Sequence, residues 1–274
     1  MSTILLTGAS GFIGSAALAE LSKHHHVITL GRKALPQAPQ QTHYIGRFSK
    51  FEDLRQLDAH RIDAVIHLAA VTGGCLERDG MQVNVEGTRC LMRYLIDRGC
   101  ARFVLASSTA VVGFQSPAFR PLQLPIPDDH PCLDRDGYGF SKYLMEKVSE
   151  YYVRQNPRVD VVNLRFATVV PDDGMPPKVG VGPIGQWAVG SITMLPRSKA
   201  VHMLKLAVES PIKPGVRTMN AVSSAAWTSV PVAEVLRNWW GDSVDLSYFE
   251  KPGNEHASVF SNHLIVQEFG PAVL

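Results

Sequence analysis

The sequence predicts an α/β protein: a doubly wound parallel sheet with helices on both faces, followed by a smaller lobe. Two observations lead to this prediction. The apolar run Ile4-Leu5-Leu6 passes directly into a glycine-rich turn and a helical pattern. Further apolar runs then alternate with helical patterns as far as residue 166. We therefore expect residues 1–166 to form the sheet domain and residues 167–274 a reduced lobe, some of whose segments return to the sheet.

The composition limits the classes of function. A net charge of +2, with 45% hydrophobic and 19% charged residues, is typical of neither a nucleic-acid-binding protein nor a disordered one. The four cysteines form no C-x-x-C pair, and the adjacent histidines 24–26 point in different directions, so neither a disulfide framework nor a metal site is expected. The sequence shows no leader pattern and no apolar stretch of about 18 residues. We expect a cytoplasmic protein with a small-molecule partner, no nucleic acid and no membrane.

The N-terminal turn follows the spacing G-x-x-G-x-x-G at Gly8, Gly11 and Gly14. The missing side chains allow a tight turn and a close approach of a pyrophosphate, and the helix that opens at Gly11 points free N–H groups at it. An ordinary strand-turn-helix is the alternative. The residues expected to contact a dinucleotide here are Gly8, Ser10, Gly11, Phe12, Ile13 and Gly14.

The second strand, residues 27–30, is followed by Gly31 and then by Arg32 and Lys33. A fold that prefers NAD usually carries Asp or Glu at this point, whereas a 2′-phosphate needs cations. Arg32 and Lys33 therefore predict NADP(H), with NAD possible and a solvated pair of charges as the alternative. Arg47 and Phe48, after the third strand at residues 43–46, are expected beside the same cofactor, with Arg47 as a further cation.

The middle of the sheet domain continues the alternation, with helices expected at about 51–57 and 81–98 and a strand at 63–67. Asn84, in the second of these helices, is more typical of an exposed residue than of a functional one. The segment after the strand is small and apolar, which suits a path beside the cofactor ribose, or simple packing. Its residues are Leu68, Ala69 and Ala70.

The strand at residues 102–106 ends in hydroxyl side chains, at the rim where open α/β sheets bind ligands. A proline-rich stretch at 116–131 follows and is expected to be a loop, either a lid or a surface excursion. Tyr138 and Lys142 then lie one helical turn apart on one face. The ammonium is expected to lower the pKa of the phenol toward working pH, as an acid-base catalyst requires.

The last third of the chain differs in composition from the sheet domain. After a sixth strand at 159–165, glycine and proline dominate residues 171–190, and we expect loops that cover a site or contact a partner. A helix near 200–209, a strand near 217–220 and a helix near 230–239 complete the expected elements.

Taken in order, these motifs resemble the extended short-chain dehydrogenase/reductase family, in its nucleotide-sugar epimerase/dehydratase group. The resemblance covers about the first 170 residues and is far more specific than any one motif. The matching segments are Thr7 to Gly14, His67 to Ala70, Asn84 to Thr88, Phe103 to Gly113, Tyr138 to Lys142 and Leu164 to Phe166.

The resemblance implies a Rossmann-like sheet with Ser108, Tyr138 and Lys142 as catalytic residues. Tyr138 would exchange a proton with a substrate oxygen, and Ser108 would hold that oxygen. Lys142 would bind the nicotinamide ribose and tune the tyrosine. Thr109 and Thr168 are also expected beside the substrate. Family members often dimerise through the helices expected here at 81–98 and 138–155, so a homodimer is expected by analogy.

The sequence departs from the family pattern at several positions. Sugar dehydratases carry an Asp-Glu pair where this chain has Thr109 and Ala110, which argues against dehydration. Arg47 replaces the usual adenine-contacting Asp, and Thr168 stands where epimerases often have Asn. The trimmed C-terminal third leaves a full nucleotide-diphosphate pocket unassured.

The expected function is an NADP(H)-dependent oxidoreductase that interconverts a ketone and a secondary alcohol on a sugar, nucleotide sugar or similar small molecule. A nucleotide-sugar epimerase that retains its NAD(P) is the first alternative. A non-catalytic, cofactor-binding regulatory protein is the second.

Overall fold

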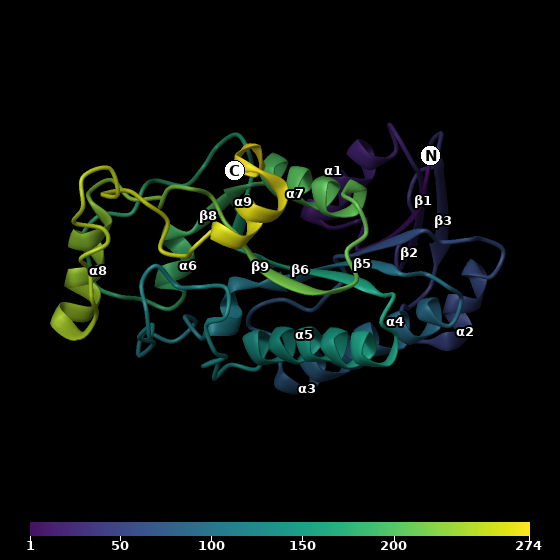
Figure 1. Cartoon of the computed structure of the whole chain (residues 1–274), viewed down its shortest axis with the longest axis horizontal. Helices are drawn as coiled ribbons and strands as arrows, with labels where there is room; N and C mark the ends of the chain where they lie inside the picture. The colour runs from purple at the N-terminus through teal and green to yellow at the C-terminus, as the bar shows by residue number, and fades with distance from the viewer.

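A computed structural model describes residues 1–274, and its centre is a seven-stranded sheet in which every neighbouring pair is parallel. The spatial order is β3-β2-β1-β4-β5-β6-β9 (Figure 1). The strands are β1 Thr3–Thr7, β2 His26–Gly31, β3 Gln41–Ile45, β4 Ala64–His67, β5 Arg102–Ser108, β6 Asp160–Phe166 and β9 Gly215–Ala221. The order reverses between β1 and β4, which is where such sheets bind ligands. The predicted doubly wound α/β fold is confirmed.

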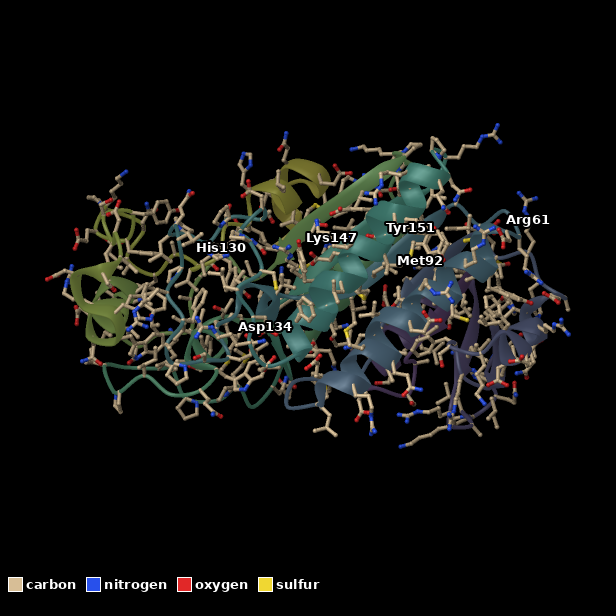
Figure 2. All side chains as sticks on the ribbon, turned by 90° about the horizontal axis from the view of Figure 1, so that it is seen from below. Arg61, Met92, His130, Asp134, Lys147 and Tyr151 are labelled. Carbon is tan, nitrogen blue, oxygen red and sulfur yellow. The ribbon has the colours of Figure 1, made fainter.

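Helices cover both faces of the sheet (Figure 1). One face carries α1 Phe12–Leu21, α7 Arg197–Glu209 and α9 His263–Phe269, and the other carries α2 Phe51–Leu54, α3 Glu77–Asp79, α4 Thr88–Ile96 and α5 Tyr138–Gln155. Figure 2 looks onto the second face, where Met92 lies on α4 and Lys147 and Tyr151 lie on α5. None of these helices combines the length and apolarity that a membrane crossing needs.

The strands read as continuous apolar runs because both faces of the sheet are buried. In β1, Ile4 and Leu6 belong to the core under α1 and α7, whereas Leu5 belongs to the core under α4 and α5. In β5 the pattern repeats, with Val104 in the first core and Phe103 in the second. Successive residues of a strand point to opposite faces of the sheet, so neighbouring residues enter different cores.

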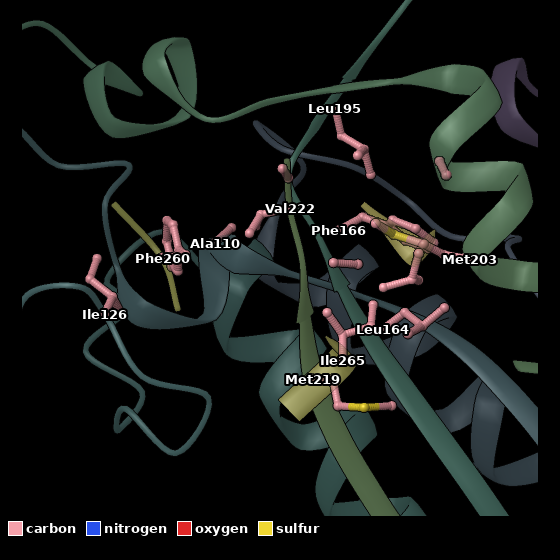
Figure 3. Close-up of a cluster of buried hydrophobic side chains, with 14 of the residues drawn as sticks. Ala110, Ile126, Leu164, Phe166, Leu195, Met203, Met219, Val222, Phe260 and Ile265 are labelled. Carbon is pink, nitrogen blue, oxygen red and sulfur yellow. The ribbon is translucent and has the colours of Figure 1, made fainter. Parts of the chain in front are cut away.

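The larger core draws the C-terminal segments back onto the sheet. Figure 3 shows Leu164 and Phe166 of β6 close to Met203 of α7, with Met219 of β9 and Ile265 of α9 nearby. The domain boundary after residue 166 stays a prediction, because β9 and α7 are integral to the main sheet and its cover. Helices α6 Ala188–Ile192 and α8 Val232–Trp240 lie toward one end of the molecule, away from β3 (Figure 1).

Several elements differ from their predictions. The expected helix at 81–98 begins as a π-helical segment, Gly80–Gly87, and becomes α-helical only in α4. A separate parallel pair, β7 Thr168–Val170 and β8 Met194–Pro196, was not predicted, and neither were α6 and α9. The strands of this pair span three residues each, too short for a period to show in the sequence.

Candidate active site

The glycine turn is built from close backbone contacts. Gly8 has a φ of +77°, and a Cβ added there would lie 2.7 Å from the Ala69 nitrogen. A Cβ on Gly14 would lie 2.0 Å from the Gly8 carbonyl oxygen, which also accepts a 2.9 Å hydrogen bond from the Gly11 N–H. Side chains at Gly8 and Gly14 are therefore excluded, as the spacing predicts.

The N-terminus of α1 fits the predicted phosphate site. Gly11 provides no side-chain cap, and the first turn holds no acidic residue. The N–H groups and the positive end of the helix dipole are therefore free for an anion. Ser10, Gly11 and Phe12 are exposed, Ile13 is half-buried, and the Arg197 guanidinium lies 4.9 Å from the centre of the Phe12 ring.

The predicted cations lie at the ends of neighbouring strands. Arg32 follows β2, Arg47 follows β3, and Gly31 pairs with Ile45 in the register. Both arginines and Lys33 are exposed, and none of the three forms an ion pair. Phe48, also expected at the cofactor, is half-buried and sets its ring edgewise against His67, with centroids 4.7 Å apart, and its cofactor contact stays a prediction.

Ser108 is the last residue of β5, and its position there follows from the strand being longer than predicted. Its hydroxyl accepts a 3.1 Å hydrogen bond from the Ala110 N–H and caps the short helical turn Thr109–Val112. Thr109 is 1% exposed and donates to the Phe166 carbonyl at 3.2 Å. This burial argues against the expected substrate contact of Thr109.

Tyr138 opens α5, and the sequence before it fixes its position. The Asp136 carboxylate accepts from the Tyr138 N–H at 2.9 Å, and the Asp134 carboxylate accepts from the Phe140 N–H at 2.7 Å. A Cβ on Gly139 would lie 2.4 Å from the Ala110 carbonyl oxygen. Gly139 therefore lets the first turn of α5 pack directly on the turn that Ser108 caps. Sequence reasoning missed this glycine and both acidic caps.

The pKa of Tyr138 corrects an expectation. Burial raises the pKa of this phenol, and a hydrogen bond with the Ser108 side chain only partly offsets that rise. Lys142 is not among the causes of the shift, and its ammonium donates to the Ala106 carbonyl at 2.7 Å. The expected lowering of the tyrosine pKa by the lysine is therefore wrong for the chain alone, although the two residues do share one face of α5.

Lys142 is itself a buried cation, with 4% of its surface exposed. Burial lowers its pKa to about 8, and the Glu146 carboxylate, one turn further along α5, opposes that shift. The ammonium is therefore close to releasing its proton near neutral pH.

Glu146 joins a buried ionic network behind the candidate catalytic residues. Both its oxygens accept from the Arg165 guanidinium at 2.8 Å, and the Ser107 hydroxyl donates to it at 2.5 Å. Arg165 also donates to the Asp128 carbonyl at 2.7 Å. These bonds connect α5 to β5 and β6, so the network holds the helix of Tyr138 against the strand of Ser108.

Asn84 is not exposed, contrary to expectation. It is 1% exposed, and its amide oxygen accepts from the Val71 N–H at 2.9 Å. Its amide N–H groups donate to the Val71 carbonyl at 3.0 Å and to the Ser141 hydroxyl at 2.9 Å. Asn84 therefore ties α5 to the segment that contains Leu68, Ala69 and Ala70, which are half-buried beside the glycine turn.

His67, at the end of β4, completes the buried polar groups beneath the site. Its ring hydrogen-bonds the Thr7 hydroxyl at 2.6 Å and the Thr88 hydroxyl at 3.1 Å. Burial, with a smaller effect from the Lys142 charge, lowers the pKa of His67 to about 3. The ring is therefore neutral and links β1, β4 and α4. Among the adjacent histidines 24–26, the side chains of His25 and His26 point in different directions, as predicted. His25 hydrogen-bonds to Glu209 and His26 to Thr42.

Thr168 lies at the opposite side of the site, at the start of β7. Its side chain is exposed and its hydroxyl donates to the Gly190 carbonyl of α6 at 2.9 Å. This bond connects the predicted substrate position to the glycine- and proline-rich segment. A direct role of Thr168 at the substrate stays a prediction.

The sheet order, the glycine turn at the switch point and the hydroxyl-bearing end of β5 define a Rossmann-like α/β protein. The family model described as "NAD dependent epimerase/dehydratase family" matches residues 4–177. The chain belongs to this family, as the motifs predicted.

Individual relatives agree with the family. UDP-glucose 4-epimerase of Drosophila melanogaster is 31% identical over 189 residues, which are 60% of this chain and 52% of that protein. The chain thus spans about half the length of the curated relatives that it matches. UDP-glucose 4-epimerase of Bifidobacterium longum in complex with NAD+ and UDP has a TM-score of 0.72 at 18% identity, covering 98% of this chain and 92% of that chain. MoeE5 in complex with UDP-glucuronic acid and NAD has a TM-score of 0.66 at 24% identity, covering 82% and 78%.

Proposed function

We propose that the chain interconverts a secondary alcohol and a ketone on the sugar of a nucleotide sugar, as an epimerase that retains its nicotinamide cofactor. The single observation that carries the proposal is the approach of Tyr138 to Ser108, made possible by Gly139 and held by the Asp136 cap. The curated relatives are UDP-glucose 4-epimerases, which favours epimerisation over the net oxidoreduction that the sequence first suggested.

Each residue has a defined task in this proposal. The Tyr138 side chain takes the proton of the substrate hydroxyl as the phenolate and returns it to the carbonyl oxygen as the phenol; in the chain alone, its raised pKa favours the phenol. The Ser108 hydroxyl, one hydrogen bond away, orients that oxygen. Lys142, held at the Ala106 carbonyl, supplies positive charge beneath the ring-binding region. With the cofactor pyrophosphate held at the glycine turn, the nicotinamide would supply the hydride chemistry.

The assay separates the two enzymatic functions. Protein with bound cofactor is incubated with UDP-glucose or UDP-galactose, and the sugar is analysed by chromatography while absorbance of the reduced nicotinamide is followed. Interconversion of the two sugars without net accumulation of reduced cofactor is expected. Accumulation of reduced nicotinamide in proportion to oxidised sugar would instead identify an oxidoreductase. Absence of both reactions with these and related nucleotide sugars would contradict the proposal.

A second candidate, an NADP(H)-dependent oxidoreductase, is favoured by one observation. Arg32, Lys33 and Arg47 are exposed and free of ion pairs at the end of β2 and β3, where a 2′-phosphate would lie. We propose that this cluster favours NADP(H). The Arg32→Ala variant should then lose at least about tenfold in NADPH affinity while its NADH affinity stays nearly constant. Equal loss for both cofactors, measured by fluorescence titration, would remove the phosphate argument.

A further inference from the structure

Trp187 lies against the candidate catalytic tyrosine, although nothing in its local sequence suggests a site. Its ring centroid is 6.5 Å from that of Tyr138, at an interplanar angle of 48°. It immediately precedes α6, in the glycine- and proline-rich segment 171–190. The residue therefore brings the C-terminal half of the chain to Tyr138.

The position of the indole is fixed from three further directions. The Phe114 ring meets it nearly edge to face, with centroids 5.9 Å apart. A Cβ on Gly73 would lie 2.7 Å from its Cη2 atom, so the benzo edge rests directly on the loop after β4. The backbone N–H of Trp187 also donates to the Gln115 backbone carbonyl at 3.4 Å. These contacts leave the indole little freedom to turn.

The backbone of Trp187 supports the same conclusion. Its φ is +60°, a left-handed conformation that is rare for a bulky residue and unfavourable in free energy. Such a conformation persists only where surrounding contacts determine it, and the contacts of Trp187 are those with Tyr138, Phe114, Gly73 and Gln115. Strained residues of this kind cluster at ligand-binding sites.

Trp187 also differs from the other tryptophans in its hydrogen bonding. The indoles of Trp227 and Trp239 donate to the Pro176 and Gly182 carbonyls, and the indole nitrogen of Trp240 is fully buried. Trp187 is half-buried, and its indole N–H has neither a protein acceptor nor complete burial. A half-buried indole with a free donor therefore lies beside the tyrosine.

A hydrogen-bonded frame connects this indole to the tyrosine. Gln115, whose carbonyl holds the Trp187 backbone, donates its side-chain amide to Asp136 at 3.2 Å. The same Asp136 oxygen accepts from the Tyr138 N–H. Gln115 is 6% exposed, so its end of this frame is shielded from water, whereas Asp136 is exposed. These hydrogen bonds hold the backbone of Trp187 close to that of Tyr138, and they thereby limit the distance between the indole and the phenol.

We propose that Trp187 is a specificity-determining wall of the substrate pocket, and that its indole stacks on the C–H face of the sugar ring whose hydroxyl reacts at Tyr138. This inference rests on the proposed function. A pyranose presents its C–H groups on its faces and its hydroxyls around its edge, so an aromatic plane beside Tyr138 packs on a face while leaving a hydroxyl for the phenol. The free indole N–H then serves a hydroxyl at the ring edge.

Calorimetric titration of the cofactor-loaded protein tests the inference with three probes: UDP-glucose, UDP alone and D-glucuronate. In Trp187→Ala, the affinity for the sugar-bearing probe that the wild type binds should fall by at least about fivefold. Affinity for UDP alone and for the cofactor should stay within about twofold of wild type. Trp187→Phe, which keeps a smaller ring, should lie between. Trp227→Phe is the matched control and should bind every probe as wild type does.

Gly73→Ala provides a second variant that keeps the indole but pushes its ring aside, because the added methyl would lie 2.7 Å from the indole Cη2. It should weaken the sugar-bearing probe in the same direction as Trp187→Ala. For whichever sugar is turned over, KM should rise more than kcat falls.

Three results would overturn the inference alone: unchanged sugar affinity in Trp187→Ala, equal losses for UDP-glucose and UDP, or tighter sugar binding, which would make the indole an obstruction. A wild-type protein that binds cofactor but none of the sugar-bearing probes would overturn both the inference and the proposed function.

Discussion

The glycines at the N-terminal turn and at the start of α5 occupy a different environment from two glycines of the segment 171–190. At Gly14 and Gly139 an added Cβ would lie 2.0 Å and 2.4 Å from a carbonyl oxygen. At Gly182 and Gly185, in the C-terminal half, it would meet nothing within 4 Å. Glycine is a packing requirement in the first region and only a source of backbone freedom in the second. The same residue type therefore carries a packing signal at Gly14 and Gly139 and none at Gly182 and Gly185.

The comparison extends to the polar groups. Within residues 1–166, Asn84, His67 and Glu146 are all buried and hydrogen-bonded between elements. In residues 171–190, Trp187 is positioned chiefly by residues from distant parts of the chain. We therefore expect substitutions in the first region to have large effects on stability or chemistry, and those in the second to change substrate preference.

The largest effect should come from Tyr138→Phe. Removal of the phenolic hydroxyl abolishes proton exchange with the substrate and should reduce kcat by about 10²- to 10⁴-fold. Cofactor affinity should change little, since the glycine turn is untouched. Tyr151→Phe, an exposed tyrosine of the same helix (Figure 2), is the control and should keep full activity. Unchanged turnover in Tyr138→Phe would refute the assignment.

Glu146→Gln should produce the next largest effect, this time on stability. The variant leaves the Arg165 guanidinium, whose side chain is 6% exposed, without its ionic partner. Breaking a buried pair of this kind costs about 3–5 kcal/mol, measurable by urea denaturation. A loss below about 1 kcal/mol would show that water or a rearranged partner replaces the carboxylate.

The same variant should alter the pH dependence of activity. The ammonium of Lys142, with a pKa of about 8, is lost as pH rises through that value, so activity that needs this charge should fall there. Glu146 raises the pKa of Lys142, so Glu146→Gln should shift the alkaline limb of the kcat/KM profile to lower pH. An unmoved limb would mean that another group controls it.

A pair of glycine substitutions tests the opening comparison directly. Gly14→Ala should destabilise the fold by about 1–3 kcal/mol and abolish tight cofactor binding, because its methyl overlaps the Gly8 carbonyl. Gly185→Ala has open space and should leave thermal stability nearly unchanged. Similar melting temperatures for the two variants would contradict the contrast between the regions.

The smallest effect is expected from His67. Its folded pKa of about 3 lies below the ordinary value near 6.5, so the unfolded chain binds a proton that the folded chain refuses. Stability should therefore fall as pH drops below about 6.5, by about 1–2 kcal/mol between pH 7 and pH 5. His67→Asn should show a flatter dependence over this range. Parallel curves for both proteins would assign the acid sensitivity to other groups.

The sequence predicted those features whose causes are local. The strand, turn and helix around Gly8 to Gly14 follow from apolar runs and a fixed spacing, and Tyr138 and Lys142 share a face because helical geometry requires it. The acidic residues Asp134 and Asp136 before α5 were missed, although acidic residues before a helix are a known start signal. The shape of the main sheet followed from the alternation of elements.

The remaining features depend on residues that are distant in sequence. Glu146 and Arg165 meet only because α5 packs against β6. The pKa of Tyr138 depends on how deeply its phenol is buried, which spacing does not reveal. Trp187 reaches the site through contacts with Gly73 and Phe114, on two separate segments. No local sequence pattern predicts these long-range contacts.

The π-helical segment Gly80–Gly87 has poorer backbone geometry than an α-helix, and it positions the side-chain amide of Asn84. An ordinary α-helix would have better backbone geometry, yet the wider turn sets Asn84 facing both Val71 and Ser141. A single-residue deletion between Gly80 and Asn84 would let the helix become regular. It would also remove the wider turn that sets Asn84 facing Val71 and Ser141. The irregular backbone of the π-helical segment thus sets the orientation of Asn84. We expect a shorter chain with a regular helix here to lose the contacts of Asn84 with Val71 and Ser141.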